Sequence, residues 1–273
     1  MIIQTAPTGA PRLAIMMHEH TALAHQFARA FGNDAFAPAE PAELMCHVVL
    51  HHDAGWFAFD RDPATDPATG LPYNLVDTPI GDITVTSRGS PDYNARHHPF
   101  CGLISSMHSF GLYNGRYGIS DMVLIDKIPA ADKPIAQRML DGELARQARL
   151  KAALAADATT AGWIAEAKLF QSYKQLQFFD TLALYFNRVH PSERRAARFT
   201  HVPVSAREDV TVTVRPVEAG VYAVAPYPFA GEGAEFAYAG RRISPEKGEG
   251  PDGWAEVLRR AATVWEAVTL VAG

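Results

Sequence analysis

The sequence predicts a mainly α-helical protein with a small, antiparallel β-rich segment at its C-terminal end. Apolar residues recur at helical spacing through most of residues 13–188. From residue 209 onward the pattern changes to short runs of β-branched residues, such as 210–214, which Gly and Pro separate. We therefore expect residues 1–200 to form one helical body, and residues 201–273 to form a β-rich extension packed on it.

Several segments are expected to form regular elements. Gly32 ends the first predicted helix, and Pro99 is a good first-turn residue for the third. The predicted helices are residues 13–31, 41–53, 99–113, 132–157 and 161–188. In the C-terminal region we expect strands at 210–214, 221–225 and 236–239, a short helix from Gly253, and a final strand within 263–271.

Residues 63–99 show little periodicity and are rich in Pro, Gly, Asp and Asn, which predicts a long loop. Loops of this length inside compact domains are commonly lids or binding loops, although a solvated excursion fits the composition equally well. The pocket wall that residues 60–99 would supply cannot be placed from the sequence, and the substrate stays unidentified for that reason.

The composition excludes several classes of protein. A net charge of −5 over 273 residues argues against a nucleic acid or an acidic membrane surface as the main partner. The sequence has neither a secretory signal nor an uninterrupted apolar run of about 18 residues. Its cysteines, Cys46 and Cys101, lie in apolar helical patterns and are not expected to form a disulfide. We therefore expect a cytoplasmic protein that acts on a small molecule.

Three polar residues interrupt apolar helical patterns. His20 shares a stripe with Phe27, His52 continues the stripe of Val48, and Asp180 lies in a segment that is apolar on nearly every side. A buried imidazole needs partners for its ring nitrogens. An isolated buried carboxylate is costly or stays protonated with a raised pKa. A metal ion would supply the countercharge that these positions need.

The adjacent pair His52 and Asp53 strengthens this interpretation. Neighbouring His and Asp side chains reach one ion only where a helix ends and the backbone turns, and Gly55 permits such a turn. We predict that one divalent cation is held by His20, His52, Asp53 and Asp180. Two imidazoles and two carboxylates without a thiolate suit iron, manganese, zinc or nickel, and one ion is expected rather than two. Such a set leaves positions for water, as catalytic sites do.

Each of these residues also has a structural interpretation. The two histidines could be hydrogen-bonded core residues, and Asp53 could cap the following turn. Asp180 could form an ion pair or a hydrogen bond with Lys174 or Gln177. The sequence alone leaves these alternatives open.

The order of these motifs resembles the HD-domain superfamily of helical metal-dependent phosphohydrolases. It is more closely similar to a bacterial family within that architecture, domain of unknown function 3891. The resemblance rests on residues 20–28, 52–56, 105–108 and 176–180, with a tail similar to 225–229. It implies an HD-domain-like helical bundle, a metal site and hydrolysis of a phosphoester.

For that reaction, Asp53 and His108 are the candidate catalytic residues. Asp53 is expected to contact the attacking water. His108 is expected to protonate the leaving oxygen, because an imidazole can hold a transferable proton near neutrality. His108 could equally be a further ligand or a structural residue. Lys174 and Arg188 are candidate phosphate contacts, although solvated positions suit both.

Two other functions stay open at this point. The first is a non-haem iron oxygenase, since some HD-like proteins use iron for oxygen chemistry. The second is a non-catalytic ligand-binding protein with a residual metal site, which predicts a closed coordination sphere. The β-rich extension could cover one end of the helical body or form a homodimer contact.

Overall fold

The computed structural model describes residues 1–244 and 253–273. Its α-helices are α1 (Met17–Ala30), α2 (Ala42–His51), α3 (Phe57–Arg61), α4 (Ile80–His97), α5 (Pro99–Tyr113), α6 (Gly115–Gly118), α7 (Leu124–Lys127), α8 (Lys133–Ala155), α9 (Glu166–Arg188) and α10 (Gly253–Arg260). Short 3-10 turns occupy Ala54–Trp56, Ala161–Ile164 and Pro191–Glu193. The strands are β1 (Ile2–Ile3), β2 (Arg12–Ile15), β3 (Ala197–Pro203), β4 (Asp209–Glu218), β5 (Val221–Ala225), β6 (Gly233–Ile243) and β7 (Thr263–Ala272).

The strands form one mixed sheet of seven strands in the order β1-β2-β6-β7-β5-β4-β3. Neighbouring strands are antiparallel except β5 and β7, which are parallel. The predicted fold class, a mainly α bundle with a small antiparallel segment at its C-terminal end, is therefore wrong. Strands hold 20% of the described residues beside 51% in helices, which makes the sheet a substantial part of the fold.

The sequence hid the N-terminal strands for a physical reason. Leu13 and its apolar neighbours in β2 run almost directly into α1, which begins at Met17, so the periodicity looks like one helix over residues 13–31. Strand β3 was missed because its register shifts between Phe199 and Val202, and this shift breaks the alternation that identifies a strand. Strands β1, β2 and β3 extend the sheet well beyond the predicted C-terminal strands.

The prediction of a long loop over residues 63–99 is also wrong, because α4 occupies the second half of this segment. The buried face of α4 carries small polar side chains instead of an apolar stripe, so helical periodicity is invisible in the sequence. These side chains bond to nearby backbone. Thr86 Oγ1 donates to the carbonyl of Ile83 at 2.8 Å, and Asn94 Nδ2 donates to the carbonyl of His51 at 2.8 Å.

The remaining predicted elements are largely confirmed. Helices α2, α5 and α8 lie within the predicted ranges 41–53, 99–113 and 132–157. The helix predicted for 161–188 begins with a 3-10 turn and continues as α9. The predicted strands in the C-terminal region, the helix from Gly253 and the final strand are present as β4, β5, β6, α10 and β7.

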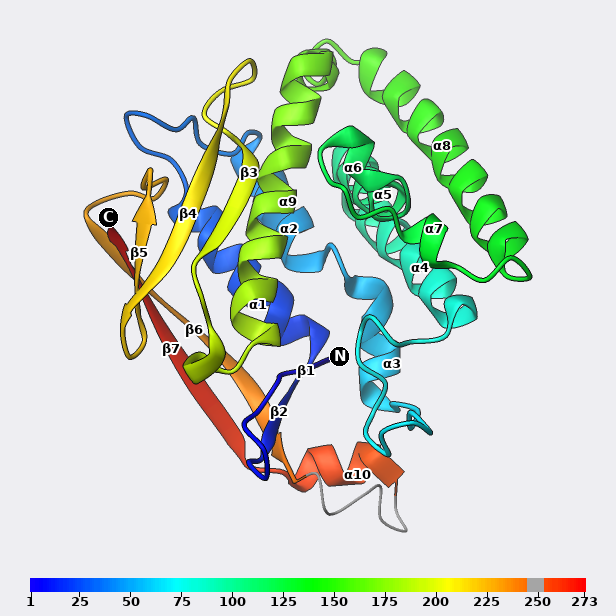
Figure 1. Cartoon of the computed structure of the whole chain (residues 1–273). Coiled ribbons are helices and arrows are strands. Elements are labelled where there is room, and N and C mark those ends of the chain that lie inside the picture. Colours follow the sequence, from blue (N-terminus) through cyan, green and yellow to red (C-terminus); the bar gives the residue numbers. More distant parts are fainter. Residues whose placement is uncertain (245–252) are drawn as a thin grey trace.

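The elements are arranged in layers (Figure 1). Helices α1 and α9 pack against each other and cover one face of the sheet, where α1 contacts β6 and α9 contacts β3. Helices α4, α5 and α8 lie on the other side of α1 and α9, and α2 contacts both groups. In the part of the chain that the structure describes, no helix is both long enough and apolar enough to cross a membrane.

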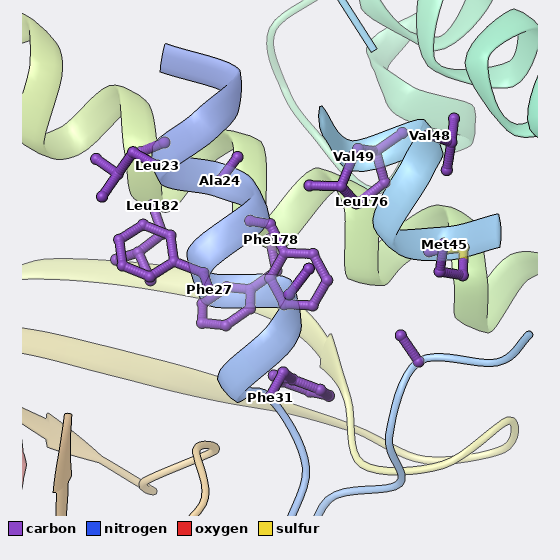
Figure 2. Close-up of a cluster of buried hydrophobic side chains, with 14 of the residues drawn as sticks. Leu23, Ala24, Phe27, Phe31, Met45, Val48, Val49, Leu176, Phe178 and Leu182 are labelled. Atoms are coloured by element: carbon purple, nitrogen blue, oxygen red, sulfur yellow. The ribbon is translucent and has the colours of Figure 1, made fainter. Parts of the chain in front are cut away.

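The main hydrophobic core lies where α1, α2 and α9 meet, and Figure 2 shows part of it. Phe27 and Leu23 of α1 and Leu176 of α9 are fully buried in this cluster. The ring of Phe27 contacts that of Phe236 on β6, with centroids 4.7 Å apart, and so ties the helices to the sheet. The same three helices carry the polar residues described next, which therefore lie on a rigid scaffold.

Candidate metal centre

His20 lies on the buried side of α1, in the stripe that includes Phe27, and its side chain is fully buried. Its Nδ1 donates a hydrogen bond to Asn187 Oδ1 at 2.9 Å. The neutral ring then carries a lone pair on Nε2, and this atom lies 3.2 Å from Asp180 Oδ1. An imidazole lone pair therefore faces a carboxylate oxygen, with no proton between them in the neutral ring.

His52 caps the C-terminal end of α2 and is fully buried. Its Nδ1 donates to the carbonyl of Val49 at 2.7 Å, which leaves Nε2 to the site. That Nε2 is buried and has no hydrogen-bond partner among the described residues. It lies 3.5 Å from Asp53 Oδ2 and 3.7 Å from Asp180 Oδ1. A buried polar atom without a partner destabilises the folded protein, and a cation bound at this position would supply the missing partner.

The charge around His52 favours any positively charged occupant. Burial lowers the pKa of His52, but the nearby carboxylates of Asp53 and Asp180 outweigh burial and raise that pKa to about 9. In the protein without metal, a proton on His52 therefore supplies the positive charge at neutral pH. A metal ion would displace this proton and take over its role.

Asp180 projects from α9 between the two histidines and is 3% exposed. Burial alone would raise its pKa, but the nearby imidazoles of His20, His52 and His108 hold that pKa well below the usual value. The guanidinium of Arg116 also approaches, with a nitrogen 3.6 Å from Asp180 Oδ2. Asp180 is therefore an anion at neutral pH despite its burial.

The predicted ligands fall into two overlapping groups. One consists of His20, His52 and Asp180, and the other of His52, Asp53 and His108; within each, one ligand atom per residue lies within 4.8 Å of the others. Both groups need His52, whose Nδ1 is already bonded to the backbone. One nitrogen cannot complete both sites, so the geometry favours a single ion. The structure brings all four predicted ligands near one another, but it places Asp53 with His108 instead of with His20.

The distances in the first group suit a metal ion. Ligands about 2.1 Å from a common ion lie roughly 3.0–3.4 Å apart at angles between tetrahedral and octahedral values. The separations of 3.2 Å and 3.7 Å from Asp180 Oδ1 to the two imidazoles are close to this range. Small side-chain adjustments would complete the coordination.

His108 extends from α5 beside His52, with ring centroids 5.1 Å apart. It is 3% exposed, and burial lowers its pKa to about 4, so the ring is neutral near pH 7. Gln177 Nε2 donates to His108 Nδ1 at 2.9 Å, and the neutral ring then carries its proton on Nε2. The site thus holds one imidazole, His108, whose Nε2 carries the proton of the neutral ring, and two, His20 and His52, whose Nε2 could bind an ion once it carries no proton.

A pocket of about 250 Å³ opens onto this cluster, and its lining includes Asp53, His108 and Asp180. Two predicted phosphate contacts have different surroundings. Arg188 lines the pocket. Lys174 instead forms an ion pair with Asp209, with a nitrogen–oxygen distance of 2.6 Å, and lines a separate pocket. The contacts of Asp180 are with His20, His52 and Arg116, not with Lys174 or Gln177 as one alternative proposed.

Arg116, which was not predicted as a site residue, lies at the junction of the site and the pocket. It belongs to α6, whose four residues form a left-handed turn and not a regular helix: φ is 68° at Gly115, 53° at Arg116, 58° at Tyr117 and 88° at Gly118. A side chain in this conformation costs about 1–2 kcal/mol per residue, so the turn is strained at two positions. Asn114 Oδ1 accepts from the backbone of Tyr117 and helps to hold it. The sequence signal is an arginine enclosed by glycines directly after an apolar helix.

Two amides orient the imidazoles: Asn187 was not predicted, and Gln177 was considered only as a partner of Asp180. Gln177 precedes Asp180 by three residues and Asn187 follows it by seven, so α9 presents all three on one face. Their shared spacing with Asp180 was the available signal. His51 lies outside both groups, and its ring is tilted by 37° against that of His47, with centroids 4.4 Å apart.

Comparison with known proteins gives one family. The family described as "Protein of unknown function (DUF3891)" matches residues 1–245. No curated protein matches the chain. No solved structure matches it either. The HD-domain part of the resemblance therefore rests on the order of the motifs alone. The match covers most of the sequence and every residue of the candidate metal centre, and the chain belongs to this family of proteins of unknown function.

Proposed function

We propose that this protein is a metal-dependent hydrolase that holds one divalent transition-metal ion and cleaves a phosphoester. The observation that carries the proposal is the buried, unpartnered Nε2 of His52 beside the carboxylates of Asp53 and Asp180. His20, His52 and Asp180 are the proposed ligands. Their nitrogen and oxygen atoms suit iron, manganese, zinc or nickel better than calcium or magnesium, which prefer more oxygen ligands.

A bound ion of this kind supplies Lewis acidity and lowers the pKa of coordinated water toward neutrality. The residues of the chain provide the remaining functions. Asp53 lies 3.5 Å from His52 on the pocket side of the cluster, where its carboxylate can accept a proton from the attacking water. The water oxygen forms a new bond to phosphorus, the phosphorus–oxygen ester bond breaks, and the leaving oxygen takes up a proton.

His108 is the proposed donor of that proton. Its pKa of about 4 in the free protein is low for a general acid at neutral pH. A phosphate group bound in the pocket would place negative charge beside the ring and raise this pKa. In the protonated ring both nitrogens carry hydrogen, so the Gln177 amide would turn to accept from Nδ1 through its Oε1, which has no partner among the described residues, and Nε2 would be left as the donor.

Arg116 is the proposed phosphate ligand. Its guanidinium lines the pocket and lies 3.6 Å from Asp180, so it is already beside the position where an anionic group would meet the metal. Arginine binds phosphate through two parallel hydrogen bonds, which fixes orientation as well as charge.

A second candidate function is a non-haem iron oxygenase, and a specific observation favours it. His20, His52 and Asp180 form a set of two histidines and one carboxylate, which is the ligand set typical of such iron enzymes. A purely structural metal is favoured less, because the pocket reaches Asp53, His108 and Asp180 and leaves the centre accessible. Iron content, a visible absorption band and oxygen consumption distinguish the oxygenase from the hydrolase.

Metal analysis of protein purified without chelator tests the proposal. We expect close to one transition-metal ion per chain in the wild type and very little in Asp180→Asn. Asp209→Asn is the control, since it removes a carboxylate that contacts α9 through Lys174 on another surface. Wild-type and Asp209→Asn protein should then hydrolyse p-nitrophenyl phosphate or bis-p-nitrophenyl phosphate with added manganese. Equally low metal content in all three proteins would contradict the proposal.

A further inference from the structure

We propose that the leaving group of the substrate is apolar, so that the substrate is a short alkyl or single-ring aryl phosphate. This inference rests on the proposed function and adds the substrate class. It is argued from the pocket that opens onto the metal centre, since whatever reaches Asp53, His108 and Asp180 must lie against the walls of that pocket.

Most of the pocket wall is apolar and comes from separate parts of the chain. Leu75 precedes α4, Ile83 lies on α4, Leu112 on α5, and Leu184 on α9. Leu124 at the start of α7 adds a further apolar side chain. A pocket lined in this way stabilises a ligand through burial of apolar surface, with a few polar groups fixing its orientation.

The apolar lining continues outward to the surface. Val76 is 56% exposed and Met122 is 55% exposed, and both side chains line the pocket. They come from segments far apart in the sequence, before α4 and after α6. Large apolar side chains that stay exposed beside a pocket are typical of a ligand-binding surface.

Three of the four hydroxyl groups in the wall, those of Thr86, Ser87 and Ser90, are already engaged. Thr86 Oγ1 donates to the carbonyl of Ile83 at 2.8 Å, and Ser90 Oγ donates to the carbonyl of Thr86 at 3.2 Å. Ser87 Oγ lies 3.3 Å from the hydroxyl of Tyr113. These bonds lie within α4 or between α4 and α5, and they leave few donors for the hydroxyls of a sugar or for the edge of a base. The wall therefore does not favour a sugar phosphate or a nucleotide.

The polar end of the ligand is expected to be an anion. Arg116, Lys127 and Arg188 all line the pocket. Neither Lys127 nor Arg188 has a carboxylate partner within the described ranges. The pocket volume of about 250 Å³ is at the small end for ligand sites, which limits the apolar portion to a short chain or one ring. Cations next to an apolar wall fit a phosphate with an apolar substituent.

Calorimetric binding of two phosphonates tests this inference without turnover. Methylphosphonate and hexylphosphonate carry the same charged group and differ only in the alkyl chain. We expect hexylphosphonate to bind at least about tenfold more tightly, since burial of two methylene groups already gives this difference. Glycerol 1-phosphate should show no such gain over methylphosphonate. Each titration is carried out on manganese-loaded protein and on metal-free protein.

Variants of the exposed rim locate the effect. Met122→Ser should reduce the preference for hexylphosphonate by at least about threefold, because one apolar contact surface is lost. Leu144→Ser is the control, since Leu144 is 47% exposed on α8 and does not line the pocket. Both substitutions replace exposed side chains, so both proteins should fold.

The outcomes separate this inference from the proposed function. If the protein binds manganese but binds the two phosphonates equally well, or binds neither, the inference is overturned and the metal centre is still supported. If the protein does not bind manganese at all but still prefers hexylphosphonate to methylphosphonate, the apolar pocket is supported and the metal-dependent hydrolase is contradicted. A preference for glycerol 1-phosphate over hexylphosphonate would also overturn the inference.

Discussion

Two groups of histidines meet at neighbouring turns of α2, and their surroundings differ. His52, at the end of α2, faces Asp53 and Asp180, and these carboxylates raise its pKa to about 9. His47, one turn earlier, stacks on His97 with centroids 3.6 Å apart, and burial together with neighbouring histidines lowers its pKa to about 4. The comparison teaches that carboxylates, more than the number of imidazoles, decide where a cation is stabilised.

The largest expected effect is on metal affinity, when one histidine of each group is replaced in turn. His52→Gln should weaken binding of manganese or zinc by more than about 100-fold, because loss of an orienting partner alone costs 10–100-fold. His47→Gln should leave the affinity unchanged, since His47 belongs to neither ligand group. Isothermal titration of both variants measures the difference. Equal losses in the two variants would show that the surface histidines bind the metal.

The pH dependence of metal binding sharpens the same comparison. The pKa of His52 is raised to about 9, so below this pH the metal must displace a proton, and affinity should rise about tenfold per pH unit from pH 7 to pH 9. His47 has a pKa of about 4 and would give no such dependence in this range. A flat affinity between pH 7 and pH 9 would contradict the assignment of His52 as the ligand.

Stability of the metal-free protein should change in the opposite direction. Because the pKa of His52 is raised on folding, its contribution to stability is fully present below about pH 6.5 and is lost as the pH rises through about 9. The melting temperature of metal-free protein should therefore fall between pH 6.5 and pH 9, whereas that of metal-loaded protein should fall less or rise. Differential scanning calorimetry of both forms gives the comparison.

A smaller effect is expected from the amide that orients His20. Asn187→Leu removes the acceptor of the His20 Nδ1 hydrogen bond and should weaken metal binding by about 10–100-fold. Gln175→Leu is the control on the same helix, because Gln175 donates to the carbonyl of Ala37 and contacts no ligand. Isothermal titration with manganese compares the two variants. Unchanged affinity in Asn187→Leu would show that the hydrogen bond does not position the ligand.

The smallest effect on stability is expected for replacement of Arg116. The same replacement should have a clear effect on substrate binding. Asparagine tolerates the left-handed conformation better than arginine, so Arg116→Asn should keep or raise stability by up to about 1 kcal/mol. The same change should raise KM for an aryl phosphate by at least about tenfold, because a bidentate phosphate contact is lost. Arg198→Asn, outside this pocket, should change neither quantity. An unchanged KM in Arg116→Asn would remove Arg116 from the binding site.

The candidate ligands could be predicted from the sequence because they break a strong pattern. His20, His52 and Asp180 each interrupt an apolar helical stripe, and burial of a polar group in such a stripe requires a partner. Arg116 gave no such signal, because it lies in an irregular turn whose position depends on how α5, α8 and α9 pack. The division of the ligands into two groups sharing His52 depends on side-chain directions at the end of α2, which periodicity does not report.

The sheet and the pocket were harder to predict for related reasons. Strand β2 merges with the apolar pattern of α1, and α4 buries small polar side chains instead of apolar ones. In both cases tertiary contacts determine the structure against the local pattern. The pocket wall depends on the second of these elements, since α4 contributes Ile83 and Thr86 to it.

The central claim is that one metal ion binds between α1, α2 and α9. The most direct test is an anomalous-difference map, recorded at the absorption edges of manganese, iron, nickel and zinc, from a crystal grown without added metal. We predict a single peak within coordination distance of His20 Nε2, His52 Nε2 and Asp180 Oδ1. The absence of a peak there, or a peak at His47 and His97 instead, would contradict the account.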